Sequence, residues 1–198
     1  MNLDVLFEDD IDVERLAEVL DGMGHPGRLA TIRGWHLHHQ ARLYAAVKGL
    51  RPLTLAHFVP DSVGPLTEVI HWGMNSLPAF THFQKRFCKP TAESKELYGY
   101  NENWHEFASS PGYFVLHEPE SRPDVVPGEL DIDYTKIPAS KPESWPAIVP
   151  NETRLGRFIY AGMIDVMRGI SQHVSIGRAF RGGKWTENYF VLCREDKN

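Results

Sequence analysis

Cysteine is scarce in this 198-residue sequence, in which Cys88 and Cys193 are the only two. Two thiols are too few for a disulfide scaffold or a cysteine-rich zinc site, so we expect both to be reduced. Apolar runs are short, and none approaches the roughly 18 residues that a membrane span requires. The opening stretch MNLDVLFEDD has neither the basic segment nor the apolar segment of a secretory leader. We therefore expect a soluble, cytoplasmic protein that does not enter a membrane.

An excess of basic residues is also missing. The 21 lysines and arginines are outnumbered by 26 acidic residues, and the net charge is −5. Proteins that follow phosphate backbones need lysine and arginine clustered on one face, so nucleic acid is not an expected partner. The sequence contains no GxSxG elbow and no HExxH zinc motif. Composition and motifs leave open whether the protein is an enzyme.

The first half of the chain has helical periodicity. Apolar residues recur at helical spacing from Val13 to Leu20, and Asp12 stands where it can cap that helix. Proline and glycine punctuate the stretches that follow. These stretches predict further helices over residues 26–48, 64–73, 76–89 and 94–109.

The second half has a different pattern. Residues 112–118 read as a strand, and in residues 128–137 Leu130, Ile132 and Tyr134 alternate with two aspartates. Asn151 is placed to cap a long helix that ends near Gln172, and a strand, a glycine turn and a final strand follow. The sequence therefore predicts an α+β fold in one compact unit. A helical part over residues 1–110 precedes a four-stranded antiparallel sheet with one long packed helix over residues 111–198.

Polar residues and glycines stand on faces that are otherwise apolar. His36 lies within the apolar stripe of its predicted helix, and the two glycines of the predicted long helix leave room on its buried side. Apolar pockets that bind ligands hold a few placed polar groups. We therefore expect a small-molecule-binding sensor or accessory protein, with its pocket between the helical half and the long helix. The predicted ligand-binding residues are His36, Gln40, His71, Trp72, Asn75, Tyr134, Gly162 and Gly169.

Two other functions stay open. The first is a small-substrate enzyme, metal-assisted or acid–base, that uses His36, His39 or His71 with Asp131 or Asp133. Each of these residues also has a plain structural interpretation, as a hydrogen-bonded core histidine or a solvated strand face. The second is an interaction scaffold, for which a large apolar patch without a pocket is expected.

The stretches GELDIDYTKI, RLGRFIYAGMIDVMRGISQHVSI and NYFVLCRED resemble the sheet-and-helix module of the 4-vinyl reductase type domain and of the related haem nitric-oxide/oxygen-binding domain. The resemblance covers element order and hydrophobic pattern. It implies a small-molecule-binding or regulatory domain, often a homodimer. In the haem type, a helix histidine binds iron and a Tyr-x-Ser-x-Arg motif holds the propionates. His105 and Tyr134 stand at matching places, but Lys136 and Pro138 replace the serine and the arginine, which argues against haem. The cofactor is left unknown: haem or a metal is possible, and neither is favoured.

Overall fold

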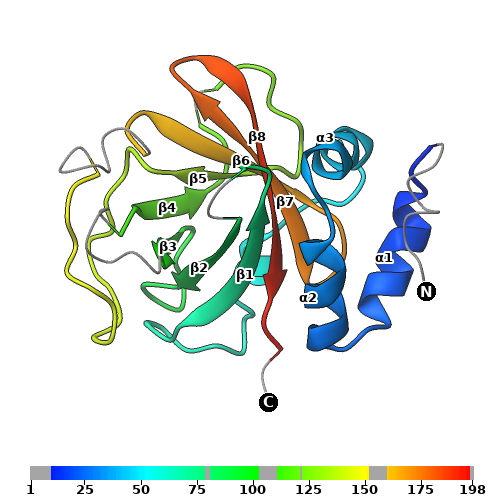
Figure 1. The fold of residues 1–198 in the computed structure, drawn as a ribbon. Coiled ribbons are helices and arrows are strands. Elements are labelled where there is room, and N and C mark those ends of the chain that lie inside the picture. The colour runs from blue at the N-terminus through cyan, green and yellow to red at the C-terminus, as the bar shows by residue number, and fades with distance from the viewer. Residues whose placement is uncertain (1–9, 79–80, 103–110, 121, 152–159, 197–198) are drawn as a thin grey trace.

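The computed structural model describes residues 10–78, 81–102, 111–120, 122–151 and 160–196. Its centre is a closed barrel of eight antiparallel strands, in which each strand pairs with its sequence neighbours and β8 closes on β1 (Figure 1). Closure pairs both edges of the sheet, so no strand edge is left open. The strands are β1 (Val69–Asn75), β2 (His82–Cys88), β3 (Leu97–Glu102), β4 (Tyr113–His117), β5 (Leu130–Asp133), β6 (Met163–Gly169), β7 (Val174–Arg181) and β8 (Lys184–Arg194).

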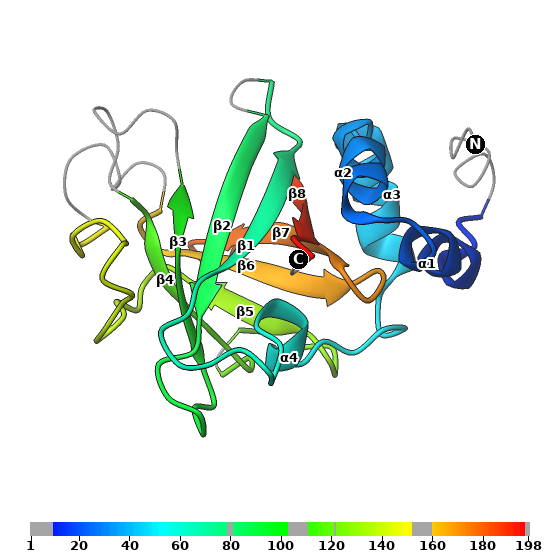
Figure 2. The ribbon, with the colours of Figure 1, turned by 90° about the horizontal axis from the view of Figure 1, so that it is seen from below.

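Four short helices accompany the barrel in the described residues: α1 (Val13–Asp21), α2 (His25–Arg33), α3 (Leu37–Ala46) and α4 (Leu55–Phe58). The first three lie on the side of the barrel where β7 and β8 run, and their apolar faces pack there (Figure 1). Helix α4 packs against the barrel at one end (Figure 2). Its Phe58 stacks on the ring of His71 and contacts Phe87, both of which face the interior. We call this end the capped end. None of the described helices combines the length and the apolar character that crossing a bilayer requires.

Large side chains fill the barrel interior, and glycines make the space for them. Three inward-facing glycines each lie under one phenylalanine ring, as Gly73 under Phe83, Gly99 under Phe114 and Gly177 under Phe190. An eight-stranded barrel is just wide enough for its side chains to fill it or for one small ligand. Each glycine is the cross-strand partner of its phenylalanine on the neighbouring strand, so the ring can lie across the glycine instead of meeting a second side chain.

Replacing Gly99 by alanine is expected to destabilise the fold by about 1 to 3 kcal/mol or more. The added Cβ would lie 2.4 Å from the Phe114 ring and 2.5 Å from the backbone oxygen of Arg86. A ring can turn, but the carbonyl belongs to a neighbouring strand and moves only with the sheet. Urea unfolding measures the loss. Gly64→Ala is the control, because its nearest neighbour is Thr67 Oγ1 at 3.7 Å, and a stability within about 0.5 kcal/mol of the wild type is expected.

The predicted α+β fold is wrong, and so are several of the predicted helices. Residues 69–73, 82–88 and 97–102, which were expected to be helical, lie in strands β1, β2 and β3. The long helix expected up to Gln172 is replaced by β6 over the part of it that the structure describes. Strand β3 and most of β6 are buried on both faces, whereas β1 and β2 keep partly exposed residues on their outer faces. A strand that is buried on both faces loses the clean alternation that marks a strand in sequence.

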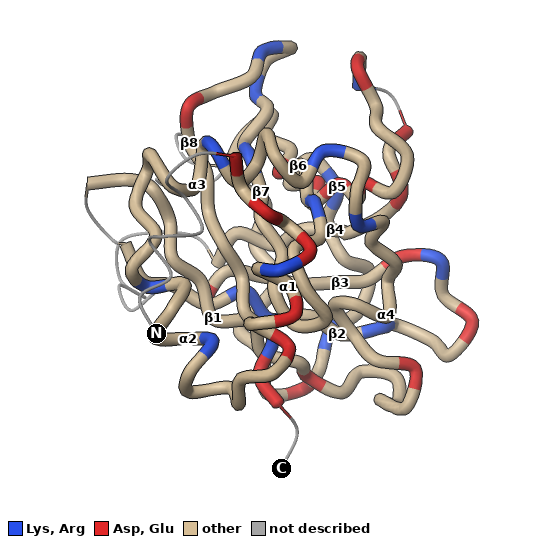
Figure 3. The backbone as a smooth tube through the Cα atoms, turned by 90° about the vertical axis from the view of Figure 1, so that its right-hand side faces the viewer, with Lys and Arg blue, Asp and Glu red and all other residues tan. Residues whose placement is uncertain are grey.

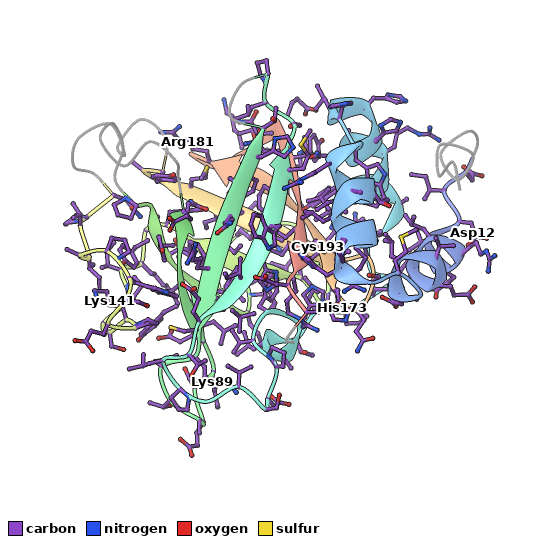
Figure 4. All side chains as sticks on the ribbon, turned by 60° about the horizontal axis from the view of Figure 1, so that its bottom comes forward. Asp12, Lys89, Lys141, His173, Arg181 and Cys193 are labelled. Carbon is purple, nitrogen blue, oxygen red and sulfur yellow. The ribbon has the colours of Figure 1, made fainter. Side chains whose placement is uncertain are left out.

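Other predictions are confirmed. Helix α1 begins behind Asp12, whose side chain accepts a hydrogen bond from Arg15 N at 2.9 Å. Strands β4 and β5 and the hairpin β7–β8 lie where they were expected, with Gly182 and Gly183 in the turn at positive φ. Both cysteines are free and buried, and Cys193 packs between β8 and the helices (Figure 4). Basic and acidic residues are interspersed along the backbone in the view of Figure 3.

Candidate ligand-binding site

A buried lysine lies inside the barrel. The alternation of β2 turns Phe83, Lys85 and Phe87 toward the interior, and the side chain of Lys85 is only 3% exposed. Lysine is almost never fully buried unless it is paired. The lysine therefore needs partners inside the barrel, and the structure supplies them.

Three side chains from other strands surround the Lys85 amine. It donates to Asn101 Oδ1 at 2.8 Å, to Asp165 Oδ2 at 3.2 Å and to the hydroxyl of Tyr134. Tyr134 donates in turn to Asp165 at 3.1 Å, and Asn101 Nδ2 donates to the Tyr134 hydroxyl at 3.0 Å. We call these four residues the Lys85 cluster. They come from β2, from β3, from the end of β5 and from β6, and only closure of the barrel brings them together.

Aromatic rings enclose the amine on its remaining sides. The distances from Lys85 Nζ to the ring centres are 5.6 Å for Phe83, 5.2 Å for Phe114, 5.0 Å for Tyr134 and 4.9 Å for Phe190. Each ring face attracts a cation and excludes water. The three phenylalanine rings also cover the inward glycines, so the glycines indirectly shape the surroundings of the amine.

Burial changes the acid–base behaviour of the Lys85 cluster. Desolvation lowers the pKa of Lys85, and the nearby Asp165 carboxylate only partly opposes this effect. Desolvation also raises the pKa of Tyr134 well above its usual value, and the charge of Asp165 acts in the same direction. Tyr134 therefore keeps its proton as a hydrogen-bond donor. The lysine amine loses its proton more readily than a lysine in water.

The Lys85 cluster is rich in hydrogen-bond donors, and those of Lys85, Tyr134 and the Asn101 amide are paired inside the cluster. A ligand oxygen would accept a hydrogen bond there by replacing one of these internal partners. The Asp165 carboxylate already balances the lysine charge. A neutral acceptor such as a carbonyl oxygen suits this arrangement better than a carboxylate, which would bring an unpaired negative charge into the interior.

The Lys85 cluster lies toward the barrel end opposite α4. Phe83 and Met163 belong to the interior core but are only half-buried, and both stand near this end on β2 and β6. The ring of Tyr160 stacks on Tyr134 at 5.1 Å. In the described residues these side chains fill the space around the cluster. A molecule that contacts Lys85 would have to displace them.

Among the predicted site residues, only Tyr134 belongs to the Lys85 cluster. His71 lies deeper in the barrel, with Nε2 3.0 Å from the Phe58 oxygen. Gln40 links α3 to the barrel by donating to the carbonyls of Trp35 at 2.6 Å and Met74 at 3.2 Å. His36 is an exposed residue at the start of α3. These residues do not converge on one site.

The remaining predicted site residues have structural positions. Trp72 is half-buried on β1, and Asn75 ends that strand and accepts from Leu77 N at 2.8 Å. Gly162 lies in a turn at φ 66° with open space beside it. A Cβ on Gly169 would meet the backbone oxygen of Arg51 at 2.6 Å. The glycines therefore serve a turn and a close chain approach, and the helix in which they were to make room is not present in the described residues.

The aspartates of the enzyme hypothesis face out of the barrel. Arg122 Nε donates to Asp131 at 2.9 Å, and Asp133 accepts from the backbone and the hydroxyl of Thr135 at 2.7 and 2.6 Å. His71 is inside, so the barrel wall separates it from both aspartates. No group of three or more histidine, cysteine or acidic side chains within the described ranges could hold a metal ion. His105 lies outside the described residues.

Two surface pockets of about 460 and 440 Å³ flank Arg194 at the capped end. The larger has side chains of both charges, among them Arg51 and Asp61. The Arg194 guanidinium donates to the backbone oxygens of Ala56, at 3.3 Å, and His57. Its hydrogen bonds hold α4 on the barrel, which accounts for the arginine without a ligand.

Comparison with known proteins gives no relative: no family model matches the chain, and neither a curated protein nor a solved structure matches it significantly. The resemblance to the 4-vinyl reductase type domain therefore stays a prediction. The long helix that formed part of its pattern is a strand where the structure describes it. Function has to be inferred from the Lys85 cluster itself.

Proposed function

We propose that the protein binds a small, mainly apolar molecule in its barrel, with one neutral carbonyl oxygen of the ligand held by the Lys85 cluster. The observation that carries the proposal is a lysine amine inside the barrel, hydrogen-bonded by three side chains and surrounded by four aromatic rings. Such a group is not needed for folding, because a buried ion pair is often no more stabilising than apolar residues of similar volume.

The ligand chemistry follows from charge and hydrogen bonding. Lys85 and Asp165 neutralise each other, so the ligand needs to bring no charge. Phenylalanine rings and Met163 offer flat apolar contacts for the rest of the molecule. An aromatic ester, ketone or aldehyde combines both properties. Small-molecule sensing or an accessory role is consistent with such a site, and the expected homodimer stays a prediction that a native mass measurement checks.

A matched pair of probes tests the proposal. Methyl 2-naphthoate carries a neutral carbonyl on a flat apolar ring, and 2-naphthoate carries a carboxylate on the same ring. We expect the ester to bind the full chain at one site, and the acid to bind at least about tenfold more weakly, because its charge is buried without a partner. Naphthalene fluorescence titrated with protein at pH 7 measures both affinities.

The double variant Lys85→Met with Asp165→Asn removes the charged pair without leaving a lone charge. It is expected to weaken ester binding about tenfold or more, the usual effect of losing a hydrogen bond from a charged group. Lys89→Met is the control. Lys89 is also a buried lysine, but it lies beyond the end of β2 and donates to the Asp61 oxygen at 3.3 Å (Figure 4). Equal ester affinity in all three proteins would show that the Lys85 cluster is not the binding site.

A further inference from the structure

We propose that Lys85 forms an imine with an aldehyde group of the bound molecule. This inference rests on the proposed function, because it uses the same site and specifies the reactive class of its ligand. The imine proposal depends on the position of the Lys85 Nζ atom. The amine lies where the ligand carbonyl is to be held, and aromatic rings separate both from bulk water.

The chemistry balances with the groups present. The lysine amine attacks the aldehyde carbon, the C–N bond forms, and one nitrogen proton is transferred to the carbonyl oxygen. The second nitrogen proton is then transferred to the same oxygen, the C–O bond breaks, and the oxygen leaves as water. The products are one imine and one water from one amine and one aldehyde, so no oxidant or reductant is required. Attack needs the unprotonated amine, and burial of Lys85 favours that form by lowering its pKa.

The neighbours of Lys85 fit the proton transfers. The Tyr134 hydroxyl contacts Nζ and donates to Asp165 at 3.1 Å, so it stands beside both the nitrogen and the leaving oxygen. Burial raises the pKa of Tyr134, so the hydroxyl keeps its proton at neutral pH and assists by donating a hydrogen bond rather than by giving up the proton. Asp165 lies 3.2 Å from Nζ and balances the charge of a protonated imine. The four rings exclude the water that would hydrolyse the imine.

Other lysines of the described chain lack this combination. Lys136 is an exposed residue whose amine pairs with both oxygens of Glu120 at 2.8 Å. Lys89 is buried, but it donates to the backbone oxygen of Asp61. Lys136 therefore serves as the exposed reference for reactivity, and Lys89 as the buried reference.

Reductive trapping tests the inference in the unmodified full chain. The protein is incubated with 2-naphthaldehyde and sodium cyanoborohydride at pH 7, and peptide mass mapping locates the secondary amine. We expect Lys85 to be labelled about tenfold faster than Lys136 or more, because binding holds the aldehyde beside the Lys85 amine. Lys89→Met should leave labelling of Lys85 unchanged.

Methyl 2-naphthoate separates the two proposals, because the ester binds without forming an imine. Labelling of Lys85 ahead of Lys136, blocked by excess ester, supports the imine. If the ester binds and Lys85 is labelled no faster than Lys136, the imine inference is wrong and the binding proposal stands. If the ester does not bind and Lys85 is not labelled, both are wrong. The mapping uses wild-type protein, so its outcome does not depend on whether a Lys85 variant folds.

Discussion

Replacing Lys85 alone by methionine is expected to lower the free energy of unfolding by about 3 to 5 kcal/mol. Methionine fills nearly the same space but donates no hydrogen bond. Asp165 would then hold its charge inside the barrel without a cation, and Asn101 Oδ1 would lose its donor. The unpaired carboxylate is the larger cost. Urea unfolding at pH 7, followed by circular dichroism, measures the loss.

The companion variant decides whether charge is the cause. Adding Asp165→Asn to Lys85→Met removes the lone carboxylate, and the amide oxygen can still accept from Tyr134. The double variant should recover to within about 1.5 kcal/mol of the wild type. Lys136→Met is the surface control, since its ion pair with Glu120 is exposed and worth less than about 1 kcal/mol. Wild-type stability in the single variant would mean that Lys85 and Asp165 do not form the buried pair.

Acid is expected to destabilise the protein by about 3 kcal/mol between pH 6.5 and pH 4 through His71 alone. Burial lowers the pKa of His71 to about 3, from 6.5 in the unfolded chain, and the hydrogen bond with the Phe58 oxygen only partly opposes this effect. Below pH 6.5 the unfolded chain therefore binds a proton that the folded chain does not. The contribution of neutral His71 to the free energy of unfolding is fully present above pH 6.5 and is lost as the pH falls toward 3.

The variant His71→Leu tests the source of this loss. Leucine has no proton to gain, so the variant should lose about 3 kcal/mol less than the wild type between pH 6.5 and pH 4. Its stability at neutral pH is expected to be about 1 to 3 kcal/mol lower, because the Phe58 carbonyl loses its partner. His38→Gln, at an exposed position of α3, is the control and should keep the wild-type pH dependence. An unchanged acid response in His71→Leu would rule out His71 as the responsible group. Urea unfolding at a series of pH values measures the free energy of unfolding of each protein.

The sequence predicts a strand only where one covered face alternates with polar residues. Residues 130–134 are an example, because Leu130, Ile132 and Tyr134 face the interior and aspartates face outward. The glycine pair at 182–183 similarly identifies the β7–β8 hairpin. Even here the outward aspartates are buried, and they pair with His117 and Arg122, which lie outside the strand. The local sequence pattern predicts the strand, but it does not predict the partners of the two aspartates.

The barrel itself could not be predicted because its interior is partly polar and its outer face partly apolar. On β2 the interior residues are Phe83, Lys85 and Phe87, within the stretch 76–89 that the sequence predicted to be a helix. The spacing of four between the two rings fits a helix turn as well as one strand face. On β6, Asp165 faces the interior and Val166 faces outward and is fully buried. Such strands carry no clear period.

The Lys85 cluster was therefore missed, apart from Tyr134. Lys85 and Asp165 are 80 positions apart, and only the pairing of all the strands between them brings the two together. A usable signal was present in the alternation Phe-x-Lys-x-Phe, which places a cation on an apolar strand face. The predicted site histidines, by contrast, lie outside the Lys85 cluster. The structure gives His71 a place in an aromatic stack and His36 an exposed helix start.

The most direct test observes Lys85 while the probe binds. In NMR spectra of the full chain with 13C- and 15N-labelled lysine, saturating methyl 2-naphthoate should shift the Lys85 Cε and Nζ resonances and leave those of Lys89 and Lys136 in place. Resonances of Lys85 that do not move at a probe concentration that saturates the protein would contradict the assignment of the barrel interior as the binding site.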